Sequence, residues 1–362
     1  MDALIVKDFQ SKGTKYLTFS NQDGKKWSIP MKNMQMALEL YEPSGIKGKI
    51  LKKLLPITAK VGIAKKILHG SYTSVEINES VKKVLVKCFG EDWEYSVFWG
   101  TPCVDQKITI QIYKKQQILG YCKIGKSERV KELFQHEKQV LDLLQQKSMS
   151  HVPKCLKLEQ VLDTSWMFVQ STEKVHGSNV KHRFGKKHNQ FINDLWYKTK
   201  EIKRFEETDY YESLIFLEEH LDLIDEKYRT SIEEAINQVK EYYSGKEVEW
   251  GVVHRDFTPW NTCLVNNDLF VFDFEYALFH APKGMDRWHY FVQTKVFECN
   301  MNMQQIAKAY NELFNSEKNA LEMTSYLLDV ISFYLGREGE GDLRISNDRA
   351  GLLYHIFQCQ KI

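Results

Sequence analysis

The residues from His254 to Glu275 form the part of the chain whose types and spacing could do chemistry. The segment reads His-Arg-Asp-Phe-Thr-Pro-Trp-Asn, continues with two apolar runs around an Asn-Asn-Asp turn, and ends in Asp-Phe-Glu. Two apolar runs that flank a polar turn predict a β-hairpin. A hairpin brings the loop before its first strand and the residue after its second strand to the same end. We therefore expect Asp256, Asn261 and Asp273 to converge.

Two carboxylates and an amide oxygen at one place suit a hard divalent cation. Mg²⁺ prefers oxygen ligands and takes only one or two of them from the protein when substrate phosphates supply others. A carboxylate that does not bind the metal can accept a hydroxyl proton as phosphoryl transfer begins. Polar residues at a hairpin end are also commonly solvated turn residues, so the cluster alone leaves both readings open.

The motif resembles the signature of the aminoglycoside phosphotransferase and choline/ethanolamine kinase family, which has a kinase-like fold. The shared pattern is His-x-Asp-x-x-x-x-Asn, followed by an apolar strand pair that ends in Asp-x-Glu. The resemblance implies that Asp256 is the catalytic carboxylate and that Asn261 and Asp273 bind Mg²⁺. It implies that His254 supports the metal-binding turn. Glu275 either helps to hold metal or substrate or bonds the local backbone.

The spacing after the motif separates small-molecule kinases from protein kinases. Arg255 gives the His-Arg-Asp form that protein kinases use, where small-molecule kinases often have Gly or Asn. However, Asp286 follows Asp273 by only 13 positions, and there is no Asp-Phe-Gly. This leaves no room for a long activation segment. By the resemblance, Asp286 opens a helix and either caps that helix or braces the catalytic loop.

The family resemblance also requires a strand lysine that holds ATP phosphates and a helix glutamate that pairs with it. Lys123 ends an apolar run, and Glu137 follows 14 residues later inside a helix predicted over residues 127–147. Glu128 and Glu132 are the rival partners. Glu137 is favoured because it lies on the apolar face of the predicted helix, where a buried carboxylate needs a cation.

A turn from Trp99 to Lys107 joins two predicted strands and is the candidate phosphate loop. Its backbone N–H groups could cover ATP phosphates, with Gly100 and Lys107 as candidate binding residues, although the turn has one glycine and no GxGxxG pattern. Lys107 either contacts a phosphate or is a solvated strand residue. The segment Val169–Glu173 falls where a hinge between two lobes would bind adenine through its backbone.

The surrounding elements predict a two-lobed α+β protein. Short β-branched and aromatic runs between residues 69 and 122 (SVEINES, KKVLVKCF, YSVFWGTP, KITIQIY and QILGYCKIG) predict an antiparallel sheet. The helix over 127–147 and two further strands, KCLKLEQVL and SWMFVQS, follow it. After residue 174 the pattern is mainly helical. We expect a basic extension (1–66), a nucleotide-binding N-lobe (67–173), and a helical C-lobe (174–362) with the catalytic hairpin and acceptor site.

Composition limits the classes of function. The 362 residues carry a net charge of +2, which argues against a general nucleic-acid-binding protein, and no apolar run reaches the length of a membrane span. No apolar core of signal-peptide length occurs near the start, and the seven cysteines include no CxxC pair. We therefore expect a cytoplasmic protein without a disulfide framework or structural zinc.

The extension holds most of the excess positive charge, with 13 lysines against five acidic residues over 1–66. Pro56 and Gly62 interrupt an apolar stripe in it, which predicts two short helices. The stripe consists of Ile50, Leu54, Ile57, Val61, Ala64 and Leu68. It either packs onto the N-lobe or lies on an anionic membrane. Membrane contact would make a lipid-linked or surface-polysaccharide sugar a plausible acceptor.

The expected function is transfer of the γ-phosphoryl group of ATP, with Mg²⁺, to a hydroxyl of a small molecule such as an amino alcohol, a sugar or an aminoglycoside-like compound. The alternative is a nucleotide-binding pseudokinase or scaffold. Acidic residues in the predicted helical region 186–247 suit either a cationic acceptor or a solvated helix face. They are Glu206, Glu207, Asp209, Glu212, Glu218 and Glu219.

Overall fold

The computed structural model divides into two compact units. It describes residues 3–10, 13–43, 46–60, 62–103, 105–178, 180, 183–314, 316–337 and 339–360. The first unit comprises Met1–Asp142, His151–Asn179 and Val265–Phe270, and the second comprises Leu143–Ser150, Val180–Leu264 and Val271–Ile362. The tip of the predicted catalytic hairpin is thus grouped with the first unit, and both ends of the hairpin lie in the second.

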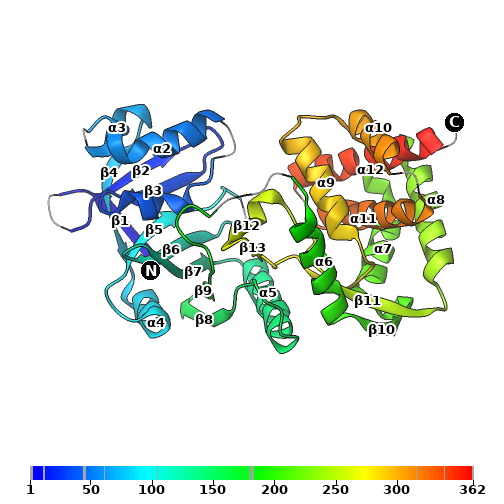
Figure 1. Ribbon diagram of the computed structural model, residues 1–362, viewed down its shortest axis with the longest axis horizontal. Coiled ribbons are helices and arrows are strands. Elements are labelled where there is room, and N and C mark those ends of the chain that lie inside the picture. The colour runs from blue at the N-terminus through cyan, green and yellow to red at the C-terminus, as the bar shows by residue number, and fades with distance from the viewer. Residues whose placement is uncertain are drawn as a thin grey trace. The chain divides into compact units, whose positions relative to one another are not determined.

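The first unit is built on a nine-stranded antiparallel sheet with the order β1-β4-β2-β3-β5-β6-β7-β9-β8 (Figure 1). The strands are β1 (Leu4–Asp8), β2 (Tyr16–Ser20), β3 (Lys26–Pro30), β4 (Ser71–Ile77), β5 (Glu94–Phe98), β6 (Ile108–Lys114), β7 (Gln117–Gly125), β8 (Cys155–Leu162) and β9 (Ser165–Ser171). The sequence correctly predicts β4 to β9 as strands. The extension adds three strands that were not predicted, and β3 joins them to the rest of the sheet through β5.

One predicted strand is wrong, because KKVLVKCF forms helix α4 (Glu79–Phe89). Asn78 caps this helix by accepting a hydrogen bond from the Ser80 N–H at 2.9 Å. Val81, Val84 and Leu85 have the spacing of one helix face and are buried. The helix predicted over 127–147 is confirmed as α5 (Glu128–Gln146).

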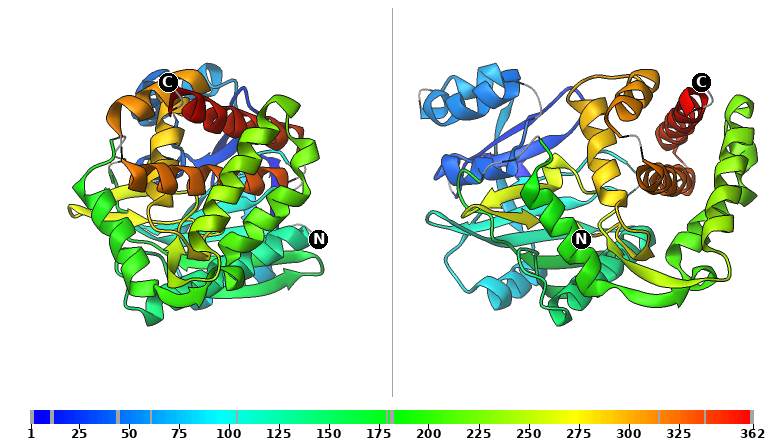
Figure 2. Two further views of the ribbon diagram at one scale, coloured as in Figure 1. Left: turned by 90° about the vertical axis from the view of Figure 1, so that its right-hand side faces the viewer. Right: turned by 45° about the vertical axis from the view of Figure 1, so that its right-hand side comes forward.

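The sheet has an apolar core on each of its faces. One core joins α4 to side chains such as Val97, Ile110 and Cys122. The other lies under α1 (Met34–Ala37), the 3-10 turn η1 (Leu38–Leu40), α2 (Ile46–Lys60) and α3 (Ala64–Ile67). The alternation of side chains along each strand supplies both cores. Figures 1 and 2 show α2 and α3 on one side of the sheet and α4 on the other.

The two helices of the extension differ from the prediction in their boundary and in the face that they bury. Pro56 lies inside α2, and the break comes near Gly62 instead. Leu55 and Ala59 are buried, whereas three members of the predicted stripe point to solvent. Those exposed members are Ile50, Leu54 and Ile57. Ala64 is buried, Leu68 is half-buried, and Val61 lies outside the described residues.

The second unit is mainly helical, as predicted. Its helices are α6 (Lys186–Thr199), α7 (Asp209–Glu219), α8 (Glu226–Tyr243), α9 (Met285–Phe297), α10 (Met303–Leu313), α11 (Glu317–Leu335) and α12 (Glu340–Gln360). Figure 2 shows α11 and α12, orange and red, packed beside each other. Trp250, Trp288 and Tyr310 lie fully inside one apolar core to which most of these helices contribute.

Short strands position the loop that contains the candidate catalytic residue Asp256. β10 (Glu201–Arg204), β11 (Glu247–Val253) and β14 (Leu278–Ala281) form one sheet, and β12 (Thr262–Val265) pairs with β13 (Asp268–Val271) in the predicted hairpin. β11 lies close against α6, since a Cβ atom on Gly251 would come within 2.8 Å of the Trp196 carbonyl oxygen. Only glycine fits there, and this contact fixes the strand that leads directly into His254.

Within the described part of the chain, no helix combines the length and the apolar character that crossing a bilayer demands.

Candidate active site

The loop after β11 is held by a carboxylate at the start of α9. Asp286 accepts hydrogen bonds from the backbone N–H groups of His254 and Arg255, each at 2.9 Å. Arg255 adopts a positive φ of 65°, so these two N–H groups can turn toward one acceptor. Burial raises the pKa of Asp286, while hydrogen bonds and nearby histidines oppose the rise. Asp286 was expected either to cap the helix or to brace the loop, and these contacts support the second role.

His254 links this loop to the end of the hairpin. Its ring is fully buried, and its Nδ1 accepts a hydrogen bond from the Asp256 N–H at 3.3 Å. Nε2 lies 3.0 Å from the Phe272 carbonyl oxygen, which can only accept. The neutral tautomer with its proton on Nε2 satisfies both contacts. One imidazole therefore ties Asp256 to the residue before Asp273.

The Asp256 carboxylate has a donor at each oxygen. Oδ2 accepts from Asn261 Nδ2 at 2.7 Å, and Oδ1 lies 3.2 Å from His289 Nε2. Asn261 Nδ2 also donates to the Asp256 carbonyl oxygen at 3.0 Å. The side chain nevertheless keeps 29% of its surface exposed. The result is a carboxylate in a fixed orientation that a reactant can still approach.

Asn261, Asp273 and Glu275 supply the oxygen atoms expected of a magnesium site. The Phe272 N–H donates to the Asn261 carbonyl oxygen at 3.1 Å, which places Asp273 next to the loop. Carboxylate oxygens of Asp273 and Glu275 lie within 4.8 Å of each other. The Asn261 amide nitrogen faces Asp256, so its Oδ1 is the atom that could bind a cation. This donor set of carboxylates and an amide fits Mg²⁺.

Arg255 has a structural partner that sequence reasoning missed. Its Nε and Nη2 atoms donate to the two carboxylate oxygens of Asp329 on α11, at 3.0 and 2.8 Å. Its guanidinium also lies over the Phe333 ring at 4.5 Å. The available signal was a lone aspartate in the apolar helical run LLDVISFYL, because a buried carboxylate needs a cation.

His289 is the second site residue that was missed. It lies on α9 three residues after Asp286, so both side chains project from the same face of that helix. Its ring is buried, and Nδ1 has no hydrogen-bond partner among the residues that the structure describes. The helical spacing from Asp286 was the signal that could have suggested it.

Lys123 and Glu137 meet inside the first unit. Lys123 Nζ donates to both carboxylate oxygens of Glu137, at 2.8 and 3.1 Å, and both side chains are buried. Glu128 instead pairs with Lys131, and Glu132 is exposed. Of the three acids weighed from the sequence, the structure thus brings Glu137 to the strand lysine. A buried cation fixed in this way is suited to a phosphate ligand.

The candidate phosphate loop joins β5 to β6. Gly100 has a φ of +84°, and a Cβ atom there would lie 2.3 Å from the Lys107 carbonyl oxygen, so the loop closes on itself at this glycine. Asp105 accepts from Ser127 Oγ at 3.0 Å and pairs with Arg129 at 3.2 Å, which ties the loop to the start of α5. The backbone of the loop therefore requires glycine at position 100. Lys107 lies immediately before β6.

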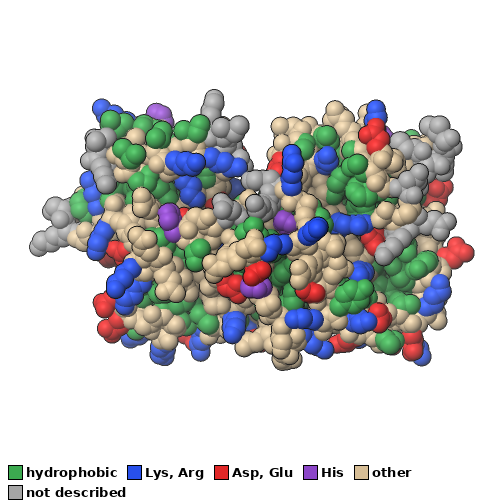
Figure 3. Space-filling model, in the orientation of Figure 1, with side chains coloured by type: hydrophobic (Ala, Val, Ile, Leu, Met, Phe, Trp, Pro, Cys, Tyr) green, Lys and Arg blue, Asp and Glu red, His purple; other side chains and the backbone are tan. Residues whose placement is uncertain are grey.

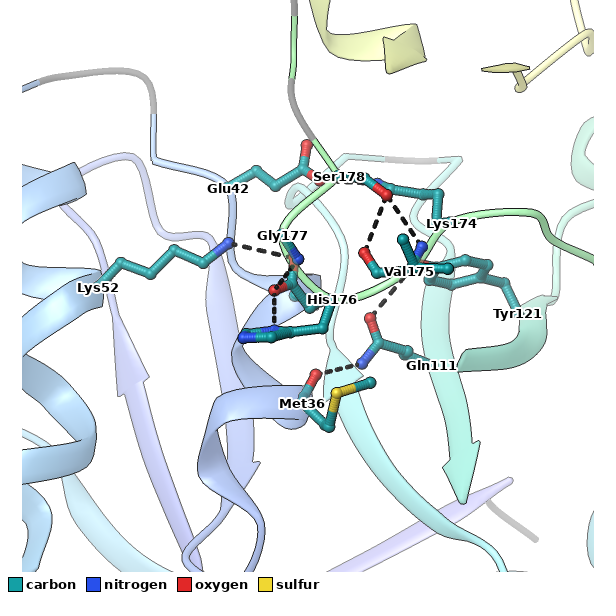
Figure 4. A network of polar contacts seen from close by, with 11 residues as sticks. Met36, Glu42, Lys52, Gln111, Tyr121, Lys174, Val175, His176, Gly177 and Ser178 are labelled. Atoms are coloured by element: carbon teal, nitrogen blue, oxygen red, sulfur yellow. Dashed lines mark hydrogen bonds and ion pairs between the residues drawn. The ribbon is translucent and has the colours of Figure 1, made fainter. Parts of the chain in front are cut away.

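The segment after β9, next to the predicted hinge, is held by the extension (Figure 4). Lys174 Nζ donates to Glu42 at 2.7 Å. Glu39 contacts His176 Nδ1 at 2.7 Å and accepts from the Gly177 N–H at 3.2 Å. Burial lowers the pKa of Lys52, the second lysine near these carboxylates, although Glu39 and Glu42 oppose the shift. Residues far apart in sequence thus fix the backbone just beyond β9.

Part of the chain matches a known family model, and the fold is similar to that of solved structures. Residues 121–282 match the model of the phosphotransferase enzyme family. One similar solved structure is a thermostable mutant of aminoglycoside phosphotransferase APH(4)-Ia in ternary complex with AMP-PNP and hygromycin B. The TM-score is 0.51 at 13% identity, and the match covers 77% of this chain and 99% of that chain. Another mutant of that enzyme, with ADP and hygromycin B, gives 0.51 at 12% identity and covers 76% and 97%.

At these identities the likeness shows the fold, and the chain has the two-lobed kinase-like fold predicted from its sequence. No curated protein matches the chain.

Proposed function

We propose that the protein transfers the γ-phosphoryl group of ATP to a hydroxyl of a small molecule, starting from the match of residues 121–282 to the model of the phosphotransferase enzyme family. The observation that carries the proposal is the Asp256 carboxylate, which Asn261 and His289 orient while part of it stays open. Every residue type that the motif requires is present, which favours an enzyme over a pseudokinase or scaffold.

The proposed reaction accounts for the proton of the acceptor hydroxyl, for the bond that forms and for the bond that breaks. As the acceptor oxygen forms its bond to the γ-phosphorus, Asp256 takes the hydroxyl proton. The bond from the γ-phosphorus to the bridging oxygen of ATP breaks, and ADP leaves. His289 and Asn261 keep the carboxylate directed at the proton that it accepts, which is the positioning that such a step depends on.

ATP and Mg²⁺ are the cofactors that fit these residues. Asn261 and Asp273 would hold Mg²⁺, with Glu275 beside them, and the ion when bound supplies positive charge to the ATP phosphates. Lys123 would bind ATP phosphates, and Glu137 fixes its ammonium group. The free thiols of Cys88, Cys122 and Cys263, together with ATP as donor, favour the cytoplasm as the compartment.

The acceptor is proposed only as a class: an amino alcohol, a sugar or an aminoglycoside-like compound. The acidic residues of the helical region do not favour a cation, since several have partners within the second unit. Asp209 binds the His280 ring at 2.9 Å, and Glu218 pairs with Lys240 at 2.6 Å. These contacts give the two acids partners within the protein, so the run supplies no argument for a cationic acceptor.

Phosphoryl transfer can be tested with the full chain and ATP labelled at the γ position. We expect label to appear on one class among amino alcohols, sugars, nucleosides and aminoglycosides. Chelation of Mg²⁺ by EDTA should abolish this transfer and restoring Mg²⁺ should recover it. Label found only in inorganic phosphate, at equal rates for the wild type and Asp256→Asn, would contradict the proposal.

Replacing His289 by leucine is expected to lower kcat about tenfold and to leave the KM for ATP nearly unchanged, because the residue orients Asp256. His289→Gln can place an N–H group close to the position of Nε2 and should keep most of the activity. Steady-state kinetics of both variants check the prediction. Equal losses in the two variants, or a rise in KM alone, would assign His289 to packing instead.

A further inference from the structure

Helices α2 and α3, together with the residue that precedes α3, carry five large aliphatic side chains that are open to solvent. Their exposed fractions are 54% for Ile50, 47% for Leu54, 64% for Ile57, 49% for Ile63 and 45% for Ile67. We call these five residues the aliphatic patch. The inward face of α2 is already satisfied, because Leu55 and Ala59 are buried in the core under the sheet. Folding of this unit therefore leaves the patch without a partner among the described residues.

Lysines accompany the patch, and acidic residues are absent from its surroundings in sequence. From residue 43 to residue 75 the chain contains seven lysines and no Asp or Glu. Lys53, Lys65 and Lys66 are exposed on the same two helices. Among the residues that the structure describes, no carboxylate is paired with Lys53 or Lys66. Figure 3 shows hydrophobic and basic side chains together on the part of the surface where Figure 1 places α2 and α3.

The position of the lysines on the helix matters for the choice of partner. Ile50, Leu54 and Ile57 follow a spacing of four and three residues, so they form one narrow ridge along α2. Lys49 and Lys53 precede Ile50 and Leu54 by one residue each, which sets them about 100° around the helix from the neighbouring ridge residue. An aliphatic ridge with lysines along its flank is the pattern of helices that lie in the interface of a bilayer.

We infer that the aliphatic patch docks on an anionic membrane surface. The aliphatic side chains would enter the boundary between headgroups and acyl chains, and the lysines would contact lipid phosphates, each adding electrostatic attraction. A second copy of the chain fits less well, because two patches face to face would bring their lysines together. Nucleic acid would leave the aliphatic ridge unused. The inference concerns the first unit and stands whether or not the chain transfers phosphate.

Vesicle co-sedimentation of the full chain tests the inference. We expect binding to phosphatidylcholine vesicles that contain about 30% phosphatidylglycerol, weak binding to pure phosphatidylcholine, and release at high salt. The variant Ile50→Ser/Leu54→Ser/Ile57→Ser should lower the partition coefficient at least about tenfold. The variant Lys53→Gln/Lys66→Gln should lower it about as much. All replaced side chains are exposed, so thermal unfolding should stay unchanged.

Control variants elsewhere on the surface test whether vesicle binding depends on the aliphatic patch or on exposed aliphatic and basic residues in general. Ile202→Ser/Leu313→Ser removes exposed aliphatic side chains from the second unit, and Lys83→Gln/Lys87→Gln removes the same charge from α4. Neither should change vesicle binding. Equal losses in the α4 variant would overturn the inference in favour of net charge alone. A wild type that ignores anionic vesicles would also overturn it, as would a dimer that the triple serine variant converts to a monomer.

Discussion

Replacing Asp256 by asparagine is expected to lower kcat by about 10²–10⁴-fold, the range that general base catalysis contributes. Asparagine fills the same space, but its amide cannot accept the proton of the acceptor hydroxyl. It also presents an N–H₂ group to either Asn261 or His289, both of which donate to the carboxylate in the native protein. The KM for ATP should change little, because Asp256 is assigned to the proton of the acceptor hydroxyl and not to ATP.

The matched control for this variant is Asp268→Asn, which removes the same charge from the first residue of β13 in the same hairpin. Its turnover should equal that of the wild type. Thermal unfolding of both variants should remain close to the native value, so that a loss of activity reports chemistry and not folding. Full turnover in Asp256→Asn would mean that another group accepts the proton.

Replacing Asp329 by leucine is expected to destabilise the second unit by about 3–5 kcal/mol. Arg255 would then keep its position in the loop without the carboxylate that accepts two of its N–H groups. The lost partner is almost completely buried, and a buried unpaired charge is far more costly than a missing surface ion pair. Urea unfolding of the purified variant measures the change in free energy.

The control for Asp329 is a second Arg–Asp pair in the same unit. Arg337 and Asp342 lie 3.2 Å apart and are partly exposed, so Asp342→Asn should cost less than about 1 kcal/mol. The double variant Arg255→Met/Asp329→Leu should recover part of the lost stability, because it removes both buried charges. A loss below 1 kcal/mol for Asp329→Leu would show that the loop rearranges to let Arg255 reach water.

Local patterns predicted the parts of the fold that are decided locally. The helix α5 has a capping serine and one apolar face, and the hairpin β12–β13 has a polar turn between two apolar runs. The segment KKVLVKCF failed because a short apolar run satisfies both a strand and a helix pattern. The burial of its side chains follows a helical pattern, because Val84 and Leu85 are buried and Val86 is only half-buried.

The extension shows why a helical stripe in the sequence does not tell which face is buried. Both faces of α2 carry aliphatic residues, and the core under the sheet accepts Leu55 and Ala59 instead of Ile50 and Leu54. Which face of α2 is buried depends on packing against β2 and β3, two strands that were not predicted from the sequence. Tertiary packing therefore reversed a prediction that periodicity alone supported.

The part of the candidate site that lies within the segment 254–275 could be predicted from the sequence. Asp256 and Asn261 lie five residues apart, so the loop brings them together without help from the rest of the chain. His289 and Asp329 reach the same loop from α9 and α11. A local pattern could mark each of them as unusual, but it does not tell which loop they contact. Only the packing of those helices shows that the two residues support the loop.

The continuity of the nine-stranded sheet makes the extension inseparable from the unit that it joins. A chain that began at residue 67 would leave the backbone groups of β5 open where β3 now pairs with them, and β4 would lose both of its neighbours. Open edges of this kind recruit strands from other molecules, which leads to aggregation. Lys174 would also lose the carboxylate of Glu42. The first 66 residues are therefore an integral part of the sheet, and removing them would open it at two places.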